Sequence, residues 1–388
     1  MTNLQAFTTD NKNWFCLPAI GLIPTEWRQK LFSNKSQPFT SFEFLSSLEQ
    51  TQCIGEKSGW LPKYFVYQTD DELGLLLCFE KHNSYGEYVF DWAWADAYHR
   101  NGIDYYPKLL CGIPFSPIPC SKWLGNNTLT ELDAFKQVAA LKHDIEYTGF
   151  HYIYPNSSIE NQDPFWSSRE GHQFHWFNQN QFEQPYLNFE QYLDSMTARK
   201  RKNIKKERQK VQDSGVECYW QSGDKVTANE LSHFYHCYHL TYLKRGQSGY
   251  LNQAFFELLC QQLGSQVQIL FCKKQQQIIA AALYIVSEDT LYGRYWGSLE
   301  NADFVHFEAC YYQGIEYAIA HKLKLFNPGT QGEHKISRGF KPTLTHSYHH
   351  LTLPPFHQAV QQFCQEEKHH NQLYMKQCEQ KLPFKQPE

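Results

Sequence analysis

The chain has 388 residues, which is too long for one ordinary core and about right for two domains. Hydrophobic residues make up 41% and aromatic residues 16%, a composition that excludes a mainly disordered chain. The formal net charge of −4 excludes a global field that draws the protein to nucleic acid or membrane, so any such affinity has to be local.

The sequence also indicates the location of the protein and the state of its cysteines. Residues 1–5 have neither a basic segment nor an apolar core, so no secretory signal is expected. The longest apolar run, Ile278 to Val286, is far shorter than the ~20 residues of a membrane span. These features predict a cytoplasmic protein with no transmembrane segment. The 12 cysteines are scattered and form no CxxC pair, which favours free thiols, and no metal site is expected.

In the first half, two apolar runs, Tyr64 to Thr69 and Leu73 to Phe79, predict a hairpin. The segment Tyr85 to Trp92 then repeats the Tyr-Gly pattern of Tyr292 to Trp296, and a short aromatic helix, Ala93 to Asn101, is predicted after it. We interpret the two halves as a degenerate duplication.

The run from Arg199 to Lys210 is the one strong electrostatic feature of the chain. Only Ile204 and Val211 give it an apolar seam, so most of this predicted helix must lie in water. It is either an ordinary solvated helix or a phosphate-binding helix for a nucleotide-linked substrate, tRNA, CoA or an anionic lipid surface. The candidate donor phosphate-binding residues are Arg199, Arg201, Lys202 and Lys205.

The second half has clear helix and strand signals. Thr227, with Glu230 three residues later, has the spacing of a capping box, and Asn252 can cap a second helix. A helical stripe of apolar residues runs from Phe307 to Ile319, and an amphipathic helix is predicted from Phe356 to Lys381. The predicted strands are Val216 to Trp220, Val267 to Lys273, Ile278 to Val286, Leu291 to Gly297, Leu323 to Phe326 and Thr343 to Leu351.

A strand-helix-strand crossover joins Leu291 to Gly297 with Leu323 to Phe326, which predicts that these two strands are parallel. The carboxyl ends of parallel strands share one sheet edge, where α/β proteins usually bind ligands. We therefore expect two segments to converge there, Ser298 to Glu308 and Asn327 to Phe340.

Several long strings resemble one bacterial family of predicted N-acyltransferases, which is also labelled peptidoglycan biosynthesis or recognition proteins and is related to the FemAB peptidyltransferases. The strings are Ser84 to Trp92, Tyr105 to Leu109, Gln173 to Trp176, Arg199 to Lys202, Leu291 to Gly297, His306 to Glu308, Gln331 to Lys335 and Arg338 to Phe340. The order of the second-half elements resembles a GNAT acyltransferase domain. The resemblance implies an α/β fold of tandem GNAT-like domains with mixed central sheets and flanking helices. We expect domains at residues 1–190 and 191–388, the second with the carboxyl-terminal helix.

The loop that follows the last crossover strand is the first candidate for chemistry. N-acyl transfer needs a neutral amine, stabilisation of an oxyanion and a proton for the leaving group. Glu333 or His334 is a candidate base, and Lys335 and Arg338 are candidates to hold phosphate or carboxylate, with Gln331 as a further substrate contact. The alternative is a solvated loop in which Glu333, Lys335 and Arg338 pair with one another.

A second group of candidates lies on the preceding strand and helix. Tyr292, Arg294 and Trp296 alternate along one strand and are expected to share a face. If this face lines a cleft, Arg294 holds an anion and Tyr292 protonates a leaving group; if it faces the core, Arg294 requires an acid such as Glu308 or Glu333. His306 and Glu308 are further substrate-binding candidates, each with a structural alternative. The first-half candidates for the same groove are Asp91, Tyr106 and Lys108.

The acyl donor stays open at the level of sequence. GNAT domains that use acetyl-CoA have a glycine-rich turn after the fourth strand, where this chain has the acidic segment Ser298 to Asp303. An aminoacyl-tRNA donor fits the basic helix better than acyl-CoA, and no tightly bound cofactor is expected. The leading hypothesis is transfer of an acyl or aminoacyl group to an amine on a small-molecule or peptide acceptor, with tRNA as a candidate partner. The alternatives are a non-catalytic module that recognises an envelope precursor and a protein that only binds nucleic acid.

Overall fold

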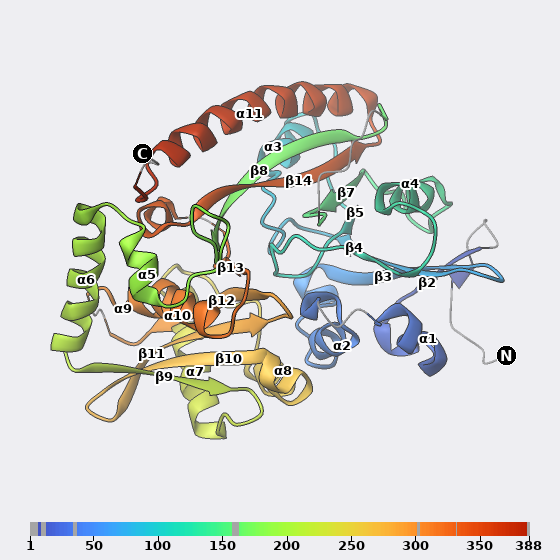
Figure 1. Ribbon diagram of the computed structural model, residues 1–388. Helices are drawn as coiled ribbons and strands as arrows, with labels where there is room; N and C mark the ends of the chain where they lie inside the picture. The colour runs from blue at the N-terminus through green and yellow to red at the C-terminus, as the bar shows by residue number, and fades with distance from the viewer. Residues whose placement is uncertain are drawn as a thin grey trace. The chain divides into compact units, whose positions relative to one another are not determined.

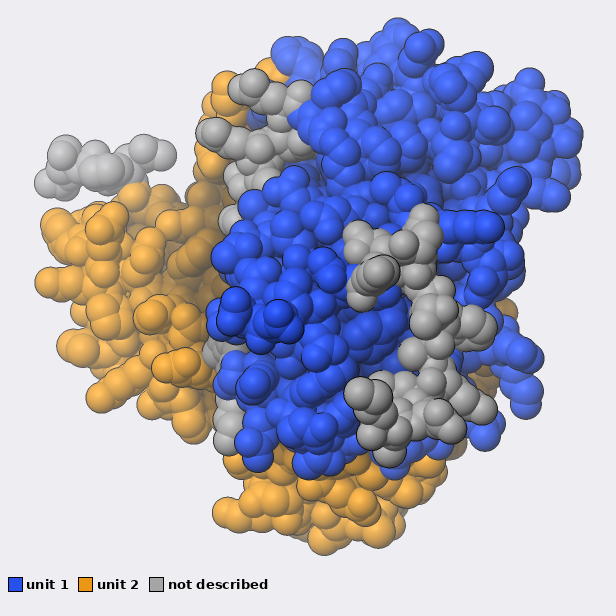
Figure 2. All heavy atoms as spheres, turned by 90° about the vertical axis from the view of Figure 1, so that its right-hand side faces the viewer, with its two compact units in different colours: residues 1–171, 344–372 blue, residues 172–343, 373–388 orange. Residues whose placement is uncertain are grey.

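The chain forms two compact units, which Figure 2 colours separately. The computed structural model describes residues 7–8, 13–33, 37–156, 163–300, 303–330 and 332–385 (Figure 1). Unit 1 is residues 1–171 and 344–372, and unit 2 is residues 172–343 and 373–388. These units differ from the contiguous halves 1–190 and 191–388 expected from the sequence, because β14 (Lys341–Leu351) pairs with β7 (Gly149–Ile153) in unit 1.

Unit 1 is a mixed sheet with flanking helices. Its strand order is β1-β2-β3-β4-β5-β7-β14, with β6 paired to β4. Among the described residues, the registered strand pairs of unit 1 are antiparallel except β5 with β7, where Leu109 lies opposite Phe150. The elements up to β7 are β1 (Phe7–Thr8), β2 (Trp14–Leu17), α1 (Thr25–Leu31), α2 (Phe42–Gln50), β3 (Trp60–Gln68), β4 (Leu73–Lys81), α3 (Trp92–Arg100), β5 (Lys108–Cys111), β6 (Trp123–Asn126) and α4 (Glu131–Ala140).

Unit 2 is a second mixed sheet, with the strand order β8-β13-β12-β11-β10-β9. Among the described residues its one parallel pair is β12 with β13, as predicted from the crossover. The elements are β8 (Ser167–Phe177), α5 (Phe189–Asp194), α6 (Ala198–Asp213), β9 (Val216–Ser222), α7 (Ala228–Leu243), α8 (Gln253–Leu263), β10 (Val267–Lys274), β11 (Gln277–Val286), β12 (Thr290–Ser298), α9 (Val305–Phe307), a π-helical turn (Glu308–Tyr312), α10 (Gln313–Ala320), β13 (Leu325–Asn327), the 3₁₀ helix η6 (Glu333–Arg338) and, from unit 1 into unit 2, α11 (Pro354–Gln380).

The two units repeat one topology. In each, an antiparallel meander leads through a helix into a parallel strand, by β5-α4-β7 in unit 1 and by β12-α10-β13 in unit 2. The counterpart of β12 is therefore β5, and the counterpart of α10 is α4. The prediction that Tyr85 to Trp92 matches Tyr292 to Trp296 is wrong, because residues 85–91 form a loop and not a strand, and its Glu87 and Asp91 bind the β5 lysine, Lys108.

The local signals of unit 2 explain its helices and its meander. Thr227 and Glu230 form the predicted capping box, and the side chain of Asn252 accepts a hydrogen bond from the amide of Phe255. The β10-β11 turn has Gln275 and Gln276 in the left-handed region, as a two-residue hairpin turn requires. Strand β11 is buried along almost its whole length, since α7 lies on one face of the sheet and the π-helical turn and α10 on the other.

Candidate functional site

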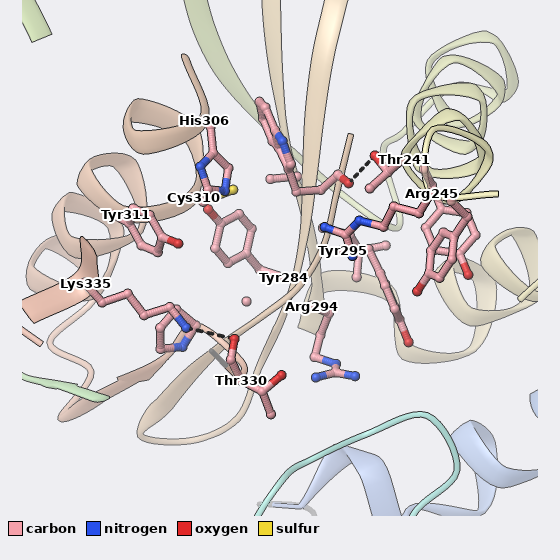
Figure 3. A pocket seen from close by; sticks show the side chains of 17 residues that line it. Thr241, Arg245, Tyr284, Arg294, Tyr295, His306, Cys310, Tyr311, Thr330 and Lys335 are labelled. Carbon is pink, nitrogen blue, oxygen red and sulfur yellow. Dashed lines mark hydrogen bonds between the residues drawn. The ribbon is translucent and has the colours of Figure 1, made fainter. Parts of the chain in front are cut away.

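A cavity of about 260 Å³ opens in unit 2 at the carboxyl end of β12 (Figure 3). Strands β12 and β13 pair over only three residues, up to Tyr292 opposite Asn327. Strand β13 ends there, while β12 continues to Ser298 without a partner on this edge among the described residues. Helix α7, the π-helical turn and the loop after β13 enclose the gap. The cavity is lined by Tyr238, Thr241, Tyr242, Arg245, Ala282, Leu283, Tyr284, Gly293, Arg294, Tyr295, Trp296, His306, Cys310, Tyr311, Pro328, Thr330 and Lys335.

A β-bulge in β12 decides which strand residues reach the cavity. Gly293 pairs with Tyr284 and Tyr295 pairs with Leu283, so Arg294 is the extra residue. The bulge inverts the alternation, and Tyr292 and Trp296 lie opposite Ile285 and Ala282, which face opposite sides of β11. The prediction that Tyr292, Arg294 and Trp296 share a face is therefore wrong. Four consecutive residues, 293–296, line the cavity instead, and Tyr292 is not among the lining residues.

Lys335 is the buried cation of the cavity. It follows the loop after β13, in which Gly329 and Gly332 have φ angles of +82° and +108° that favour glycine. Its side chain is 1% exposed, and its Nζ donates to the carbonyl oxygens of Gly329 at 2.9 Å and Thr330 at 3.2 Å. Burial lowers the pKa of Lys335 from 10.5 to about 7. The neutral form of this amine is therefore accessible near neutral pH.

The lining of the cavity is cationic and contains no acid. It includes Lys335, the half-buried Arg294 and the exposed Arg245, and none of its residues is Asp or Glu. Tyrosine and threonine hydroxyls supply further donors. Burial lowers the pKa of the fourth nitrogen base of the lining, His306, to about 4, which keeps its imidazole neutral. The arrangement suits an anionic group.

The two segments predicted to meet at this sheet edge do meet. The ring of His334 lies 5.9 Å from that of His306 and 5.5 Å from that of Phe307. Nε2 of His334 is hydrogen-bonded to the hydroxyl of Tyr311 at 2.7 Å, and this hydroxyl belongs to a cavity-lining residue. Burial, followed by the charges of Arg338 and Lys335, lowers the pKa of His334.

Other predicted residues of the loop are held in contacts outside the cavity. Arg338 is 5% exposed, donates to Glu207 at 2.7 Å and to the Tyr312 hydroxyl at 2.9 Å, and lies over the ring of Phe307. The hydroxyl of Tyr374 donates to Glu333 at 2.7 Å. The alternative of a solvated loop in which Glu333, Lys335 and Arg338 pair with one another is therefore wrong. Gln331 lies outside the residues that the structure describes.

Glu308 is also engaged away from the cavity. It accepts from Arg208 at 2.9 Å and 3.1 Å, and Arg208 also donates to Glu316. Neither Glu308 nor Glu333 lines the cavity.

Three predicted residues belong to a buried ion cluster inside unit 1. Lys108 is fully buried and donates to Asp91, to Glu87 at 2.8 Å and to Ser84 at 2.9 Å. Burial opposes its charge, but Asp91 and Glu87 outweigh burial and raise the pKa of Lys108. The hydroxyl of Tyr106 is hydrogen-bonded to Ser84 at 2.8 Å. Lys108 and Asp91 thus neutralise each other.

The predicted basic helix is α6, and it has the thin apolar seam expected of it, since Ile204 and Val211 are its buried residues. Arg201 donates to Asp194 at 3.1 Å and Lys205 donates to Glu190 at 2.7 Å. Arg199 and Lys202 are exposed. The four residues therefore lie on one helix, and two of them have acid partners.

Sequence reasoning missed Arg245, Tyr311, Cys310 and Thr330. Tyr311 and Cys310 lie on the apolar helical stripe, a pattern that predicts core packing. Both belong to the π-helical turn, and both line the cavity. Arg245 follows the end of α7 in a polar segment that carries no motif.

The chain matches one protein-family model and is similar to solved structures of low sequence identity. The model of the FemAB-like family, described as peptidoglycan biosynthesis/recognition, matches residues 19–386. The crystal structure of FemX is 11% identical, with a TM-score of 0.50, over 87% of this chain and 97% of FemX. L-PGS from Bacillus licheniformis is 12% identical, with a TM-score of 0.47, over 82% of this chain and 95% of its own. Among curated proteins, none matches the sequence significantly.

The fold class predicted from the sequence, an α/β fold of tandem GNAT-like halves with mixed central sheets and flanking helices, is confirmed. In the described part of the chain, no helix combines the length and apolar character needed to cross a membrane.

Proposed function

Because the chain belongs to the FemAB-like family of peptidoglycan biosynthesis and recognition proteins, we propose that it is an N-acyltransferase that works in the unit 2 cavity. It moves an acyl or aminoacyl group to an amine on a peptidoglycan precursor or another small metabolite. The observation that carries the proposal is Lys335, a buried amine with a pKa of about 7 in a cavity lined by no acid.

Lys335 supplies a base that is matched to neutral pH. When the acceptor nitrogen bonds to the acyl carbon it must lose a proton, and neutral Lys335 accepts that proton. A base whose pKa lies near the working pH combines a large neutral fraction with sufficient basicity. The ammonium that results is buried away from bulk water, where its charge stabilises the developing oxyanion strongly.

The Tyr311 hydroxyl supplies the proton for the leaving group. Burial raises the pKa of Tyr311, so its hydroxyl stays protonated and is able to donate. When the bond from the acyl carbon to the donor oxygen or sulfur breaks, Tyr311 protonates that atom and recovers a proton along its hydrogen bond to His334. The exposed His334 takes a replacement proton from solvent, and the proton accepted by Lys335 passes to solvent when the products leave. His334 thus acts through Tyr311, while Tyr292 and Glu333 lie outside the cavity lining.

Arg245 and Arg294 hold the anionic part of the substrates. Guanidinium groups bind phosphate and carboxylate through paired hydrogen bonds. An aminoacyl-tRNA and an acyl-CoA both carry phosphates, and both are candidate donors. The acids of the segment after β12, Glu300 and Asp303, disfavour a pyrophosphate at that position, which supports the aminoacyl-tRNA. The chemistry proposed uses no tightly bound cofactor.

The test is a transfer assay with the whole protein. Panels of charged tRNAs and acyl-CoAs are combined with amine-bearing precursors, and the acceptor is followed by its mass shift. We expect transfer with one donor class, a rate that rises through pH 7, and a loss of roughly 10²- to 10⁴-fold in Lys335→Met. Lys322→Met, an exposed lysine change in the same unit, is the matched control.

Two results contradict the proposal. One is a Lys335→Met protein that transfers as fast as the unaltered protein. The other is a precursor that binds to the cavity while no donor in either panel is consumed, which supports a recognition module instead. Metabolites or peptides that lose a mass increment when the protein is deleted from its cell identify the acceptor.

A further inference from the structure

Two of the largest exposed apolar side chains in unit 2 lie on one short loop, residues 178–188, between β8 and α5. Phe182 is 71% exposed and Leu187 is 80% exposed. The loop is closed by hydrogen bonds, from the amides of Phe182 and Gln184 to the Asn180 side chain and from the Leu187 amide to the Gln191 side chain. These apolar groups are therefore presented to solvent by ordered backbone.

The loop leads directly into α5, which lies beside α6 in Figure 1. Glu190 at the start of α5 contacts Lys205, and Asp194 at its end contacts Arg201, so the two helices are antiparallel. The guanidinium of Arg208 lies 4.7 Å from the ring centre of Phe189, two residues after Leu187. The exposed loop is therefore next to the second half of α6.

Helix α6 keeps a surplus of positive charge after its ion pairs are subtracted. The acids that face it are Glu190, Asp194, Glu308 and Glu316, and these are paired with Lys205, Arg201 and Arg208. Of its own two acids, Glu207 pairs with Arg338 and Asp213 accepts a hydrogen bond from Gln209. The basic residues of α6 for which the described residues provide no acid partner are Arg199, Lys200, Lys202, Lys206 and Lys210.

We propose that α6 and the 178–188 loop form a docking face for an anionic lipid surface. A cationic helix next to projecting apolar side chains fits the boundary between headgroups and acyl chains, where lysine lies at the headgroups and Phe182 and Leu187 enter the apolar layer. Nucleic acid would use the cations, but it offers no apolar phase for Leu187. The association is peripheral and does not depend on the proposed transfer reaction.

The test is flotation of the whole protein with lipid vesicles, without donor or acceptor. We expect binding to phosphatidylcholine vesicles that contain about 40 mol% phosphatidylglycerol, and much weaker binding to phosphatidylcholine alone. Lys202→Gln with Lys206→Gln lowers the partition coefficient about 30-fold. Phe182→Ser with Leu187→Ser lowers it about tenfold. Lys225→Gln with Lys324→Gln removes the same charge from exposed positions of unit 2 outside α6 and leaves binding unchanged.

Binding of uncharged tRNA by the same proteins separates lipid from nucleic acid. The proposal is overturned if the vesicles do not bind, if the Phe182 and Leu187 variant binds vesicles as well as the unaltered protein, or if the Lys202 and Lys206 variant loses tRNA but keeps lipid. Because no acyl transfer is measured, failure of lipid binding leaves the proposed reaction standing, and failure of the reaction leaves lipid binding standing. Thermal unfolding of each variant shows that the changes act on binding and not on the fold.

Discussion

Lys335 links the folding free energy of the protein to pH. Its pKa is about 7 in the folded chain against an ordinary value of 10.5, so between these values the unfolded chain binds more protons. The free energy of unfolding therefore rises as pH increases from 7 towards 10.5, by up to about 1.4 kcal/mol per pH unit for this one group. Lys335→Met removes that contribution.

Urea unfolding at pH 7 and pH 9 checks the linkage. We expect the free energy of unfolding of the unaltered protein to rise relative to that of Lys335→Met between these two values. Lys81 of unit 1, whose pKa burial also lowers to about 7, is present in both proteins and cancels. Lys322→Met, at an exposed lysine, should follow the unaltered protein, and an equal pH response in all three proteins contradicts the linkage.

What single residues do was only partly predictable from the sequence. The glycine-rich loop predicted Lys335 as a candidate site residue, and Lys335 lines the cavity. Its lowered pKa comes from burial, which the sequence does not give. The contacts of Arg338 were also not predictable. It was expected to bind an anion of the substrate, but its guanidinium binds Glu207, a residue 131 positions away. The buried pair of Asp91 and Lys108 depends in the same way on a loop folded back onto β5.

Gly297 lets helix α7 lie directly against β12 and so sets one wall of the cavity. A Cβ at this position would lie 1.9 Å from the carbonyl oxygen of Cys237, which is backbone and cannot turn away. The hydroxyl of Thr241 donates to the Trp296 carbonyl at 3.0 Å, a bond that requires this close approach. We expect Gly297→Ala to lower the free energy of unfolding by about 3 kcal/mol or more.

Chemical denaturation with a matched glycine change checks this packing. A Cβ at Gly21 would meet nothing within 4 Å, and Gly21 is exposed, so Gly21→Ala should alter stability by less than about 0.5 kcal/mol. If Gly297→Ala is as harmless as Gly21→Ala, the close approach of α7 does not define the wall.

Elements with local signals were predicted well, and those with tertiary causes were not. The Thr227 capping box, the Asn252 cap, the three-stranded meander and the parallel β12-β13 pair are all confirmed. The bulge at Arg294 was missed because alternation in the sequence looks unbroken there. The π-helical turn was missed because one inserted residue leaves an apolar stripe almost unchanged.

In the chain as a whole, unit 1 includes a strand, β14, that follows unit 2 in the sequence, and the sequence pattern does not specify this pairing. Tyr348 and His349 of β14 lie opposite Tyr152 and His151 of β7, almost two hundred positions earlier. An alternating strand fits many partners, so the pattern predicts a strand there without predicting its neighbour. Unit 1 therefore takes its last strand, with the buried side chains of Tyr348 and Leu351, from the end of the chain.

This organisation predicts how fragments fold. Residues 1–171 alone lack β14 and leave the β7 edge and its core neighbours uncovered, so we expect the fragment not to fold cooperatively. Joining residues 344–372 to Gly171 through a short Gly-Ser linker should restore folding, because a Cβ at Gly171 would lie only 3.0 Å from Thr345 Oγ1.

Near-ultraviolet circular dichroism and thermal unfolding measure the outcome. The joined fragment should melt cooperatively, and the same fragment with Tyr348→Asp should not, because that change buries an unpaired charge in the unit 1 core. If residues 1–171 melt cooperatively without β14, unit 1 does not need that strand. The first part of the chain would then have a complete core of its own.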